Sequence, residues 1–145
     1  MGMKLLIGLD GHGSGERAMA HAQMLAKLIG DCELIAAYVI EWSPYSFQTQ
    51  EENAQRHKRR EEEISTAKSR IIDPAVKKLQ DAGFTASGVV RHGDVAETLN
   101  ALAEEQGADQ IIVGRSSEGG FTRRIFGSAT SNLVMSASVH VTVVV

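Results

Sequence analysis

Two kinds of hydrophobic pattern alternate along this chain. Short apolar runs of strand length are typical of β-strands that are covered on both faces. Longer segments, in which apolar residues recur every three or four positions, are typical of helices that pack by one side. We predict strands at residues 4–10, 33–40, 85–91, 109–113 and 139–145, and helices at residues 16–29, 48–82, 95–106 and 128–136.

Local signals mark several of the predicted helix ends. Gly30 follows the first helix and is placed to end it in a left-handed conformation. Asp94 and Glu97 have capping-box spacing at the start of the third helix. In the last helix we expect Leu133 and Val134 to face the interior of the protein.

The second helical segment changes character halfway. Residues 51–63 are almost entirely charged, with basic and acidic side chains at helical spacing, so we interpret them as a solvated helix end rather than a basic binding patch. From Ile64 onward an apolar stripe predicts packing on the sheet. Proline lacks an N–H and disfavours helix at the preceding residue. At Asp73 and Pro74 we therefore expect a kink, or a restart with Asp73 as the N-cap.

The order of these elements predicts one α/β domain that spans residues 1–145. A strand and a helix alternate four times before a last strand, which favours an open, five-stranded parallel sheet with helices on both faces. Ligands of such sheets bind beyond the carboxyl ends of the strands. Asp10 follows the first strand, before a predicted turn at residues 11–15, and Gly114 ends the fourth. If these two strands are neighbours, both residues line one crevice.

The stretch from Ile111 to Thr130 is the best candidate for binding chemistry. A strand is followed by a loop rich in Gly, Ser and Arg, and then by a helix that Gly127 and Ser128 open. Helix N-termini carry unpaired N–H groups and partial positive charge, and glycine lets the backbone approach an anion. This order indicates phosphate binding. The same residue types also turn corners and cap helices, so a purely structural role stays open at this point.

Composition narrows the classes of function. The chain has 145 residues, 15 basic and 18 acidic side chains, and a net charge of −3, which gives no reason to expect a nucleic acid as partner. Its apolar runs are far shorter than the roughly 20 residues of a membrane span. Because a strand begins almost at the first residue, we expect no signal peptide. Cys32 is the only cysteine, which fits a reducing, cytoplasmic compartment.

The loop after the fourth strand resembles the hallmark motif of the universal stress protein family. That motif reads Gly-x2-Gly-x9-Gly-Ser/Thr, and residues 114–128 are similar to it, with Gly114 at its start and Gly127 and Ser128 at its end. The Asp-Gly pair that begins at Asp10 and the Gly-Asp pair that ends at Asp94 also resemble the family's sequences. The resemblance covers essentially the whole chain.

This resemblance implies a sheet in the order 3-2-1-4-5, of the adenine nucleotide alpha hydrolase-like type, and ATP as the ligand of many members. It places Asp10 and Val39 near the adenine and Gly114 near the ribose and phosphates. Gly127 and Ser128 would hold the phosphate tail together with Mg²⁺. The candidate nucleotide-binding residues are Leu9, Asp10, Val39, Val113, Gly114, Arg115, Ser116, Ser117, Gly127, Ser128, Ala129 and Thr130.

One residue departs from the motif and leaves two hypotheses open. Ser117 stands where the family has its second glycine, so its hydroxyl either donates to a phosphate and preserves binding or its Cβ crowds the site. The first hypothesis is an ATP-binding, non-catalytic stress or signalling protein. The second is an interaction module of the same fold without nucleotide binding. A slow ATPase is a third reading, but the sequence has no P-loop lysine, no spacing that nominates a Ser-His-Asp set and no metal-binding pattern.

The last predicted strand, from Val139 to Val145, suggests a partner. It is rich in β-branched residues, and at a sheet edge it would expose unpaired backbone groups and apolar side chains. We expect the protein to form a homodimer through this strand, with an unidentified protein partner sensing the ligand state. The alternative is a strand that helices shield.

Overall fold

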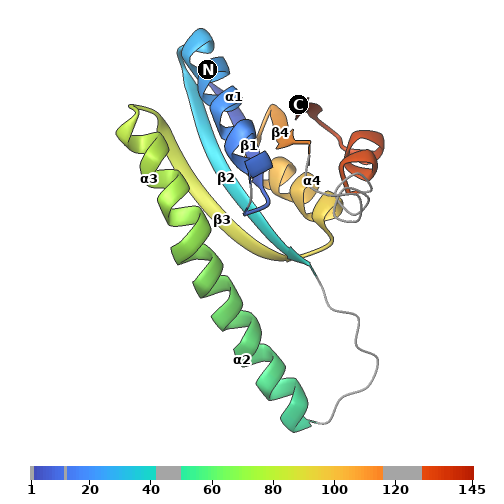
Figure 1. The fold of residues 1–145 in the computed structure, drawn as a ribbon. Helices are drawn as coiled ribbons and strands as arrows, with labels where there is room; N and C mark the ends of the chain where they lie inside the picture. Colours follow the sequence, from blue (N-terminus) through green and yellow to red (C-terminus); the bar gives the residue numbers. More distant parts are fainter. Residues whose placement is uncertain (1, 12, 42–49, 116–128) are drawn as a thin grey trace.

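The chain forms an open parallel sheet with helices on both faces, as Figure 1 shows for a computed structural model. The structure describes residues 2–11, 13–41, 50–115 and 129–145. The sheet order is β3-β2-β1-β4-β5, which confirms the predicted fold and strand order. The strands are β1 (Met3–Leu9), β2 (Cys32–Glu41), β3 (Thr85–Gly93), β4 (Gln110–Gly114) and β5 (His140–Val144).

The helices cover the sheet in two layers. Alternating strand residues point to opposite faces, so Leu5 and Ile7 of β1 pack on one side and Leu6 packs on the other. The first side is covered by α1 and α3, and the second by α4 and by a helix over residues 129–136. The labelled helices are α1 (Gly13–Ile29), α2 (Gln50–Ala67), α3 (Asp73–Asp81) and α4 (Val95–Gln106), with a π-helical turn, η1 (Lys68–Ile72), between α2 and α3.

The first helix begins earlier than its sequence suggests. We predicted a turn over residues 11–15, but α1 already starts at Gly13. The Asp10 carboxylate accepts a hydrogen bond from the Gly15 N–H at 3.1 Å, which fixes the first helical turn in spite of its glycines. The predicted end is confirmed, because Gly30 follows α1 with a φ of +89°.

Two further expectations about the helices are wrong in part. Of the two alternatives at Asp73 and Pro74, the N-cap is contradicted: Asp73 has helical dihedral angles, and its N–H donates to the carbonyl of Lys68 five residues back. This wide π-turn lets the helix continue through Pro74, which has no N–H to donate. In the last helix Leu133 is 1% exposed but Val134 is 53% exposed. Successive helical residues lie about 100° apart, so only one of them faces the core.

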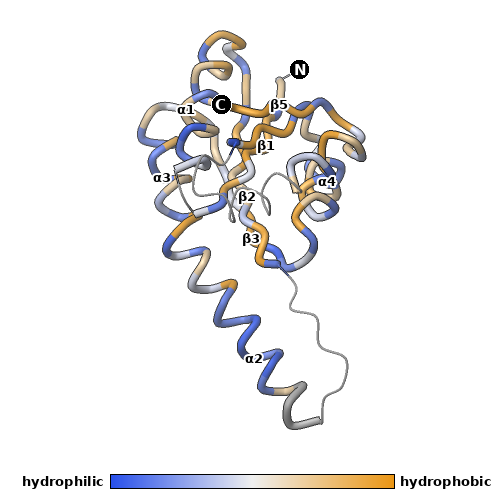
Figure 2. Tube along the Cα trace, turned by 45° about the vertical axis from the view of Figure 1, so that its right-hand side comes forward, coloured by the Kyte–Doolittle hydropathy of each residue, from blue (hydrophilic) through white to orange (hydrophobic). Residues whose placement is uncertain are grey.

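One helix extends well beyond the sheet. Figures 1 and 2 show α2 projecting past the ends of β2 and β3, with mostly hydrophilic residues along its length. Residues 54–63 are largely exposed, as expected for a solvated helix end. Ala67, at the end of α2, is buried, and Ile72 at the end of η1 packs into the core on the α1 and α3 face.

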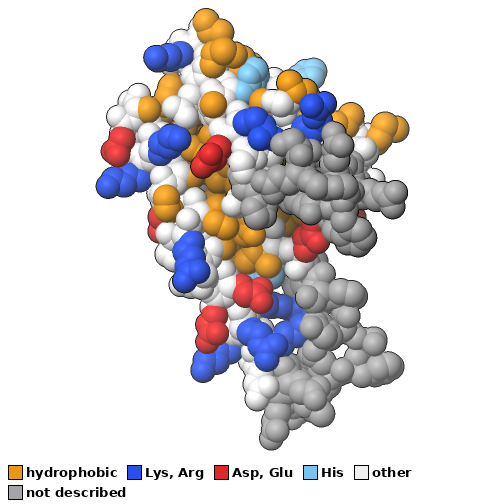
Figure 3. All heavy atoms as spheres, viewed as in Figure 1, with side chains coloured by type: hydrophobic (Ala, Val, Ile, Leu, Met, Phe, Trp, Pro, Cys, Tyr) orange, Lys and Arg blue, Asp and Glu red, His pale blue; other side chains and the backbone are white. Residues whose placement is uncertain are grey.

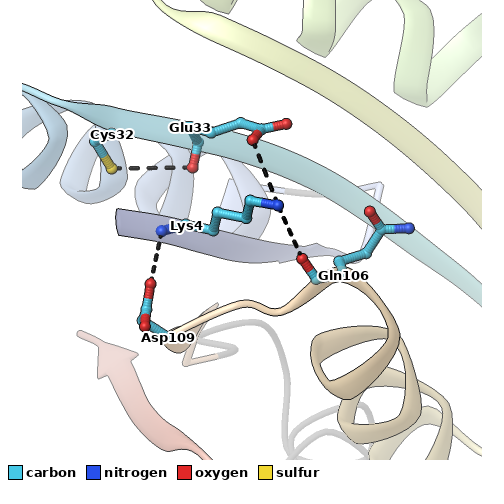
Figure 4. Close-up of polar contacts among 5 residues, drawn as sticks. All are labelled: Lys4, Cys32, Glu33, Gln106 and Asp109. Carbon is cyan, nitrogen blue, oxygen red and sulfur yellow. Dashed lines mark hydrogen bonds and ion pairs between the residues drawn. The ribbon is translucent and has the colours of Figure 1, made fainter. Parts of the chain in front are cut away.

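Polar contacts tie the strands together at the amino edge of the sheet. The Lys4 N–H donates to the Asp109 carboxylate at 2.9 Å, and the Lys4 ammonium donates to the Gln106 carbonyl at 3.2 Å (Figure 4). The same ammonium lies 3.9 Å from the Glu33 carboxylate. Lys4 therefore joins β1 to β2 and to the segment that leads into β4, at the edge opposite the carboxyl ends of the strands.

Candidate functional site

A cavity of about 290 Å³ opens at the carboxyl ends of β1, β2 and β4. The chain runs from β1 to β2 on one side, whereas β4 lies on the other side of β1, so the strand order reverses here. Open α/β sheets bind their ligands at such a point. The cavity is lined by Gly8, Leu9, Asp10, Ser14, Tyr38, Val39, Ile40, Glu41, Val95, Leu99, Val113, Gly114, Ala129, Thr130 and Leu133.

Asp10 lies between the cavity and the start of α1. Its carboxylate accepts hydrogen bonds from the Gly15 N–H and from the Ser14 hydroxyl. Ser14 is 7% exposed and lines the same cavity. These bonds orient the Asp10 carboxylate beside the cavity that it lines.

Gly114 meets Ser14 in a backbone-to-backbone contact. A Cβ at Gly114 would lie 2.6 Å from the Ser14 carbonyl carbon and 3.0 Å from its Cα, closer than side chains are normally accommodated. Any larger residue at this position would therefore push β4 and α1 apart. The glycine brings the end of β4 and the first turn of α1 together on one wall of the cavity.

The segment that follows β4 is fixed at its first residue. The Arg115 N–H donates to the Val144 carbonyl at 2.7 Å, which continues the pairing of β4 with β5. The Arg17 guanidinium, from α1, donates to the Arg115 carbonyl. Arg115 thus leaves the sheet in a defined direction, although its own side chain does not line the cavity.

The walls of the cavity are mainly aliphatic. Val39 and Val113 are each 9% exposed at the strand ends, while Leu99 of α4 and Leu133 of the last helix are almost fully buried. Such walls favour a flat apolar group, and a few polar groups at the rim fix its orientation. The polar side chains of the lining are Asp10, Ser14, Tyr38, Glu41 and Thr130.

The structure brings seven of the twelve predicted site residues to this cavity. Arg115 is described but exposed, and only its backbone takes part in the contacts above. Ser116, Ser117, Gly127 and Ser128 lie outside the described residues. The seven lining residues are Leu9, Asp10, Val39, Val113, Gly114, Ala129 and Thr130.

Sequence reasoning missed the remaining eight lining residues. Ser14 could have been predicted from the sequence. It lies four residues after Asp10, which ends the first strand, and at this spacing a hydroxyl at the start of a helix can reach the carboxylate. Most of the others looked like ordinary core positions of strands and helices, and Glu41 directly follows the predicted second strand without a motif to mark it. The missed residues are Gly8, Ser14, Tyr38, Ile40, Glu41, Val95, Leu99 and Leu133.

Among the residues that the structure describes, no group of three His, Cys, Asp or Glu side chains is arranged to hold a metal ion. Within the same residues, no helix is both long and apolar enough to cross a membrane.

Comparison with known proteins gives a consistent result. The family model described as "Universal stress protein family" matches residues 1–145. No curated protein sequence matches the chain. Solved structures show the same fold. Universal stress protein UspA from Lactobacillus plantarum is 23% identical with a TM-score of 0.76, and the match covers 99% of this chain and 97% of that one.

Two further structures of this fold are complexes with nucleotides. A universal stress protein in complex with cAMP is 22% identical, with a TM-score of 0.69 and coverage of 99% of this chain and 96% of that one. The universal stress protein from Archaeoglobus fulgidus in complex with dAMP is 17% identical, with a TM-score of 0.63 and coverage of 99% and 98%. At these identities the likeness concerns the fold.

Proposed function

The chain belongs to the universal stress protein family, and we propose that its cavity binds an adenine nucleotide, namely ATP with Mg²⁺. The protein would then act as a non-catalytic stress-response or signalling module, working as one domain in the cytoplasm. The observation that carries this proposal is the aliphatic cavity at the reversal of strand order, where Asp10 and Gly114 lie on one wall. The complexes of similar structures with cAMP and dAMP support it.

The described walls suit an adenine base. Val39, Val113 and Leu133 offer apolar surface to a flat ring. Asp10 lines the cavity, a carboxylate oxygen is a hydrogen-bond acceptor, and the exocyclic amine of adenine is a donor. Guanine presents a carbonyl oxygen at the corresponding position, which a carboxylate would repel. We therefore propose that the site prefers adenine to guanine.

The phosphates would extend toward the segment that begins at Arg115. We propose that Ser116, Ser117, Gly127 and Ser128 hold them through backbone N–H groups and hydroxyls. The described residues offer no cluster of carboxylates for a metal, so Mg²⁺ would be bound chiefly by phosphate oxygens, with the Ser128 hydroxyl as a further ligand. When bound, Mg²⁺ would neutralise part of the phosphate charge.

Thermal unfolding with and without nucleotide tests this proposal. A ligand at one hundred times its dissociation constant stabilises a protein by about 2.7 kcal/mol. For a chain of this length we expect Mg-ATP to raise the Tm by about 4–10 °C. GTP at the same concentration should raise it much less. An unchanged Tm at millimolar Mg-ATP would reject nucleotide binding.

A matched pair of variants tests whether the ATP-dependent rise in Tm comes from binding in this cavity. Val95 lines the cavity in the first turn of α4, where an acidic residue suits the helix dipole. Val95→Glu should abolish the ATP-dependent rise in Tm, because its carboxylate would repel the nucleotide. Thr98→Glu lies on the same helix but outside the cavity lining, and should leave the rise intact. Equal responses from both variants would place the nucleotide elsewhere.

The departure at Ser117 is tested separately. If wild-type protein shows no shift but Ser117→Gly gains one, the second hypothesis is supported and the chain is an interaction module whose site has been closed. If both bind, the Ser117 hydroxyl is compatible with phosphate binding.

We also propose that the protein is a homodimer through residues 139–145. β5 lies at the edge of the sheet, so one side of its backbone has no strand partner among the described residues. Exposed apolar side chains precede and follow this strand: Val134 and Met135, in the helix before β5, are 53% and 86% exposed, and Val145 is 77% exposed. Pairing two such edges would satisfy the backbone, and we propose that the interface also covers these side chains.

A further inference from the structure

A second cavity lies on the other side of the connection between β1 and α1. Its volume is about 390 Å³, and its walls come from the first turns of α1 on one side and from η1 and α3 on the other. Leu9 lines both cavities. The lining residues that matter most here are Met19, Ala75 and Ile71 at the apolar surface, and Glu16, Arg70 and Lys78 at the charged surface.

The π-turn η1 supplies two residues of the wall of this cavity. In η1 the N–H of Asp73 donates to the carbonyl of Lys68, a wider turn than in an α-helix. The turn carries Arg70 and Ile71 into the cavity wall, and Pro74 follows directly. The opposite wall includes Gly11, Gly13 and Gly15, and a Cβ at Gly11 would lie 3.4 Å from the Ile71 Cδ1 atom. Single π-turns inside helices occur frequently at functional sites.

The inner surface of the cavity is apolar and belongs to the core. Met19 is 6% exposed and Ala75 is 7% exposed, and both are members of the hydrophobic cluster between the sheet and the helices α1 and α3. Leu9 and Ile71 are half-buried beside them. An apolar group of a ligand that entered here would leave water for a surface already held in place by the fold.

The outer surface carries an excess of positive charge. Arg70 and Lys78 are exposed, and neither side chain has an ion pair or hydrogen bond with another described residue. Among the described lining residues Glu16 is the only acidic one, so their formal charge is +1 in a chain whose net charge is −3. Figure 3 shows hydrophobic side chains reaching the surface between charged ones on the face over α1 and α3.

We propose that this cavity binds a small amphipathic anion. An aromatic or aliphatic body would occupy the surface formed by Met19, Ile71 and Ala75, and a carboxylate would lie between Arg70 and Lys78. Both the apolar surface and the cations are needed for this preference. Apolar surface alone would favour a neutral ligand, and the cations alone would favour inorganic phosphate. This site is distinct from the nucleotide cavity and does not depend on nucleotide binding.

Titration of the ¹⁵N-labelled full chain, followed by NMR, tests the proposal with three compounds. 2-Naphthoate carries both features, 2-naphthamide lacks the charge, and inorganic phosphate lacks the apolar body. We expect saturable shifts at the amides of Met19, Ala75 and Val76 with 2-naphthoate, with a dissociation constant of about 1 mM for a ligand of this size. The other two compounds should bind at least about fivefold more weakly.

Each contrary result rejects the proposal. No saturation by about 10 mM 2-naphthoate would show that the cavity is not a binding site, given the affinity expected for this ligand size. Equal binding of 2-naphthamide would remove the role of the cations, and equal binding of phosphate would remove that of the apolar surface. Shifts confined to Val113 and Leu133 would place the compound in the nucleotide cavity instead.

Variants supply the matched control. Lys78→Glu and Arg70→Glu change exposed side chains, so the fold should be retained, and each should weaken 2-naphthoate binding by about fivefold or more. Lys77→Glu makes the same charge change on the same helix outside the lining and should leave binding unchanged apart from a small long-range effect. Equal losses from Lys77→Glu and Lys78→Glu would show that only overall charge matters. Ala75→Leu should fill the cavity and remove binding; tight binding in that variant would contradict this location.

Discussion

Gly114 has a structural reason to be glycine that is independent of any ligand. Its Cα hydrogen faces the backbone of Ser14, where a Cβ would lie within 2.6 Å of the carbonyl carbon. Gly114→Ala should therefore destabilise the protein without nucleotide by about 1–3 kcal/mol, because β4 or α1 must move. Urea unfolding, read from the midpoint at constant m-value, measures this change.

Gly13 provides the control for that substitution. The nearest atom to a Cβ at Gly13 is the Arg17 Nη1, at 3.6 Å, which is an ordinary contact. Gly13→Ala should leave stability unchanged or raise it by up to about 1 kcal/mol, because alanine favours helix over glycine. If Gly114→Ala were as stable as wild type, the close approach of β4 and α1 would be wrong.

Cys32 is expected to be an unreactive thiol. Burial raises its pKa above the ordinary value, and the carboxylates of Asp109 and Asp31 raise it further. At pH 8 the folded protein should react with iodoacetamide more slowly than a free thiol or the urea-unfolded chain, because the thiolate is the reacting form. Equal rates in the folded and unfolded protein would contradict the burial of this side chain.

The raised pKa of Cys32 also has a consequence for stability. The folded state prefers the protonated thiol, so its contribution is fully present below the ordinary thiol pKa and is lost as pH rises through the folded one. Cys32→Ala should lack this loss above about pH 9. The comparison of wild type and variant across that range isolates the thiol from other titrating groups.

At the scale of the element, α4 is the helix whose ends are best defined. The Asp94 side chain accepts from the Glu97 N–H at 3.0 Å, and Gly107 ends the helix in a left-handed conformation. Asp94→Ala should destabilise the protein by about 1 kcal/mol, and Asp94→Asn should restore most of that loss. Asp81→Ala, at the exposed C-terminal end of α3, removes the same charge without a cap and should be neutral or slightly stabilising.

This helix also shows what could be predicted from sequence. Both of its ends carry a capping residue, and the predicted range of 95–106 matches Val95–Gln106. The start of α1 was missed because Gly13 and Gly15 resemble a turn, and the local hydrogen bond from the Gly15 N–H to the Asp10 carboxylate, which fixes them in the helix, was not anticipated. The π-turn was missed because Asp73–Pro74 signals a break, while the compensating bond to Lys68 leaves no mark in the sequence.

The candidate site was predictable only in part, for a related reason. Asp10 and Gly114 have polar or glycine signals at strand ends, so their place at the cavity could be inferred once the strands were ordered. Tyr38, Leu99 and Leu133 have the same periodicity as core residues. Whether such a side chain fills the core or lines a cavity depends on the distance between elements, which local pattern does not encode.

At the scale of the molecule, the edge strand β5 predicts the oligomeric state. Sedimentation equilibrium at micromolar concentration should give twice the mass of the chain. Met135→Glu and Val145→Glu place charges on exposed apolar positions that we propose are covered by the interface, and should weaken dimerisation at least about tenfold. Ala101→Glu, on the exposed side of α4, should have no effect. A wild-type protein that stays monomeric would reject the dimer.

The two edges of the sheet differ, because both cavities lie at the carboxyl ends of the strands. The amino edge of the sheet is held by Lys4 and its partners, whereas the carboxyl edge offers space on both sides of the β1–α1 connection. The nucleotide proposal concerns the side where β1 and β4 diverge. Its central claim is that an adenine nucleotide binds there with a defined stoichiometry.

Isothermal titration calorimetry of Mg-ATP into the purified protein, with Mg-GTP as the comparison, tests this claim most directly. We predict a saturable heat with one nucleotide per chain, at least about tenfold tighter binding of ATP than of GTP, and loss of the signal in Val95→Glu but not in Thr98→Glu. No saturable heat at millimolar Mg-ATP, or the same heat in Val95→Glu as in wild type, would contradict it.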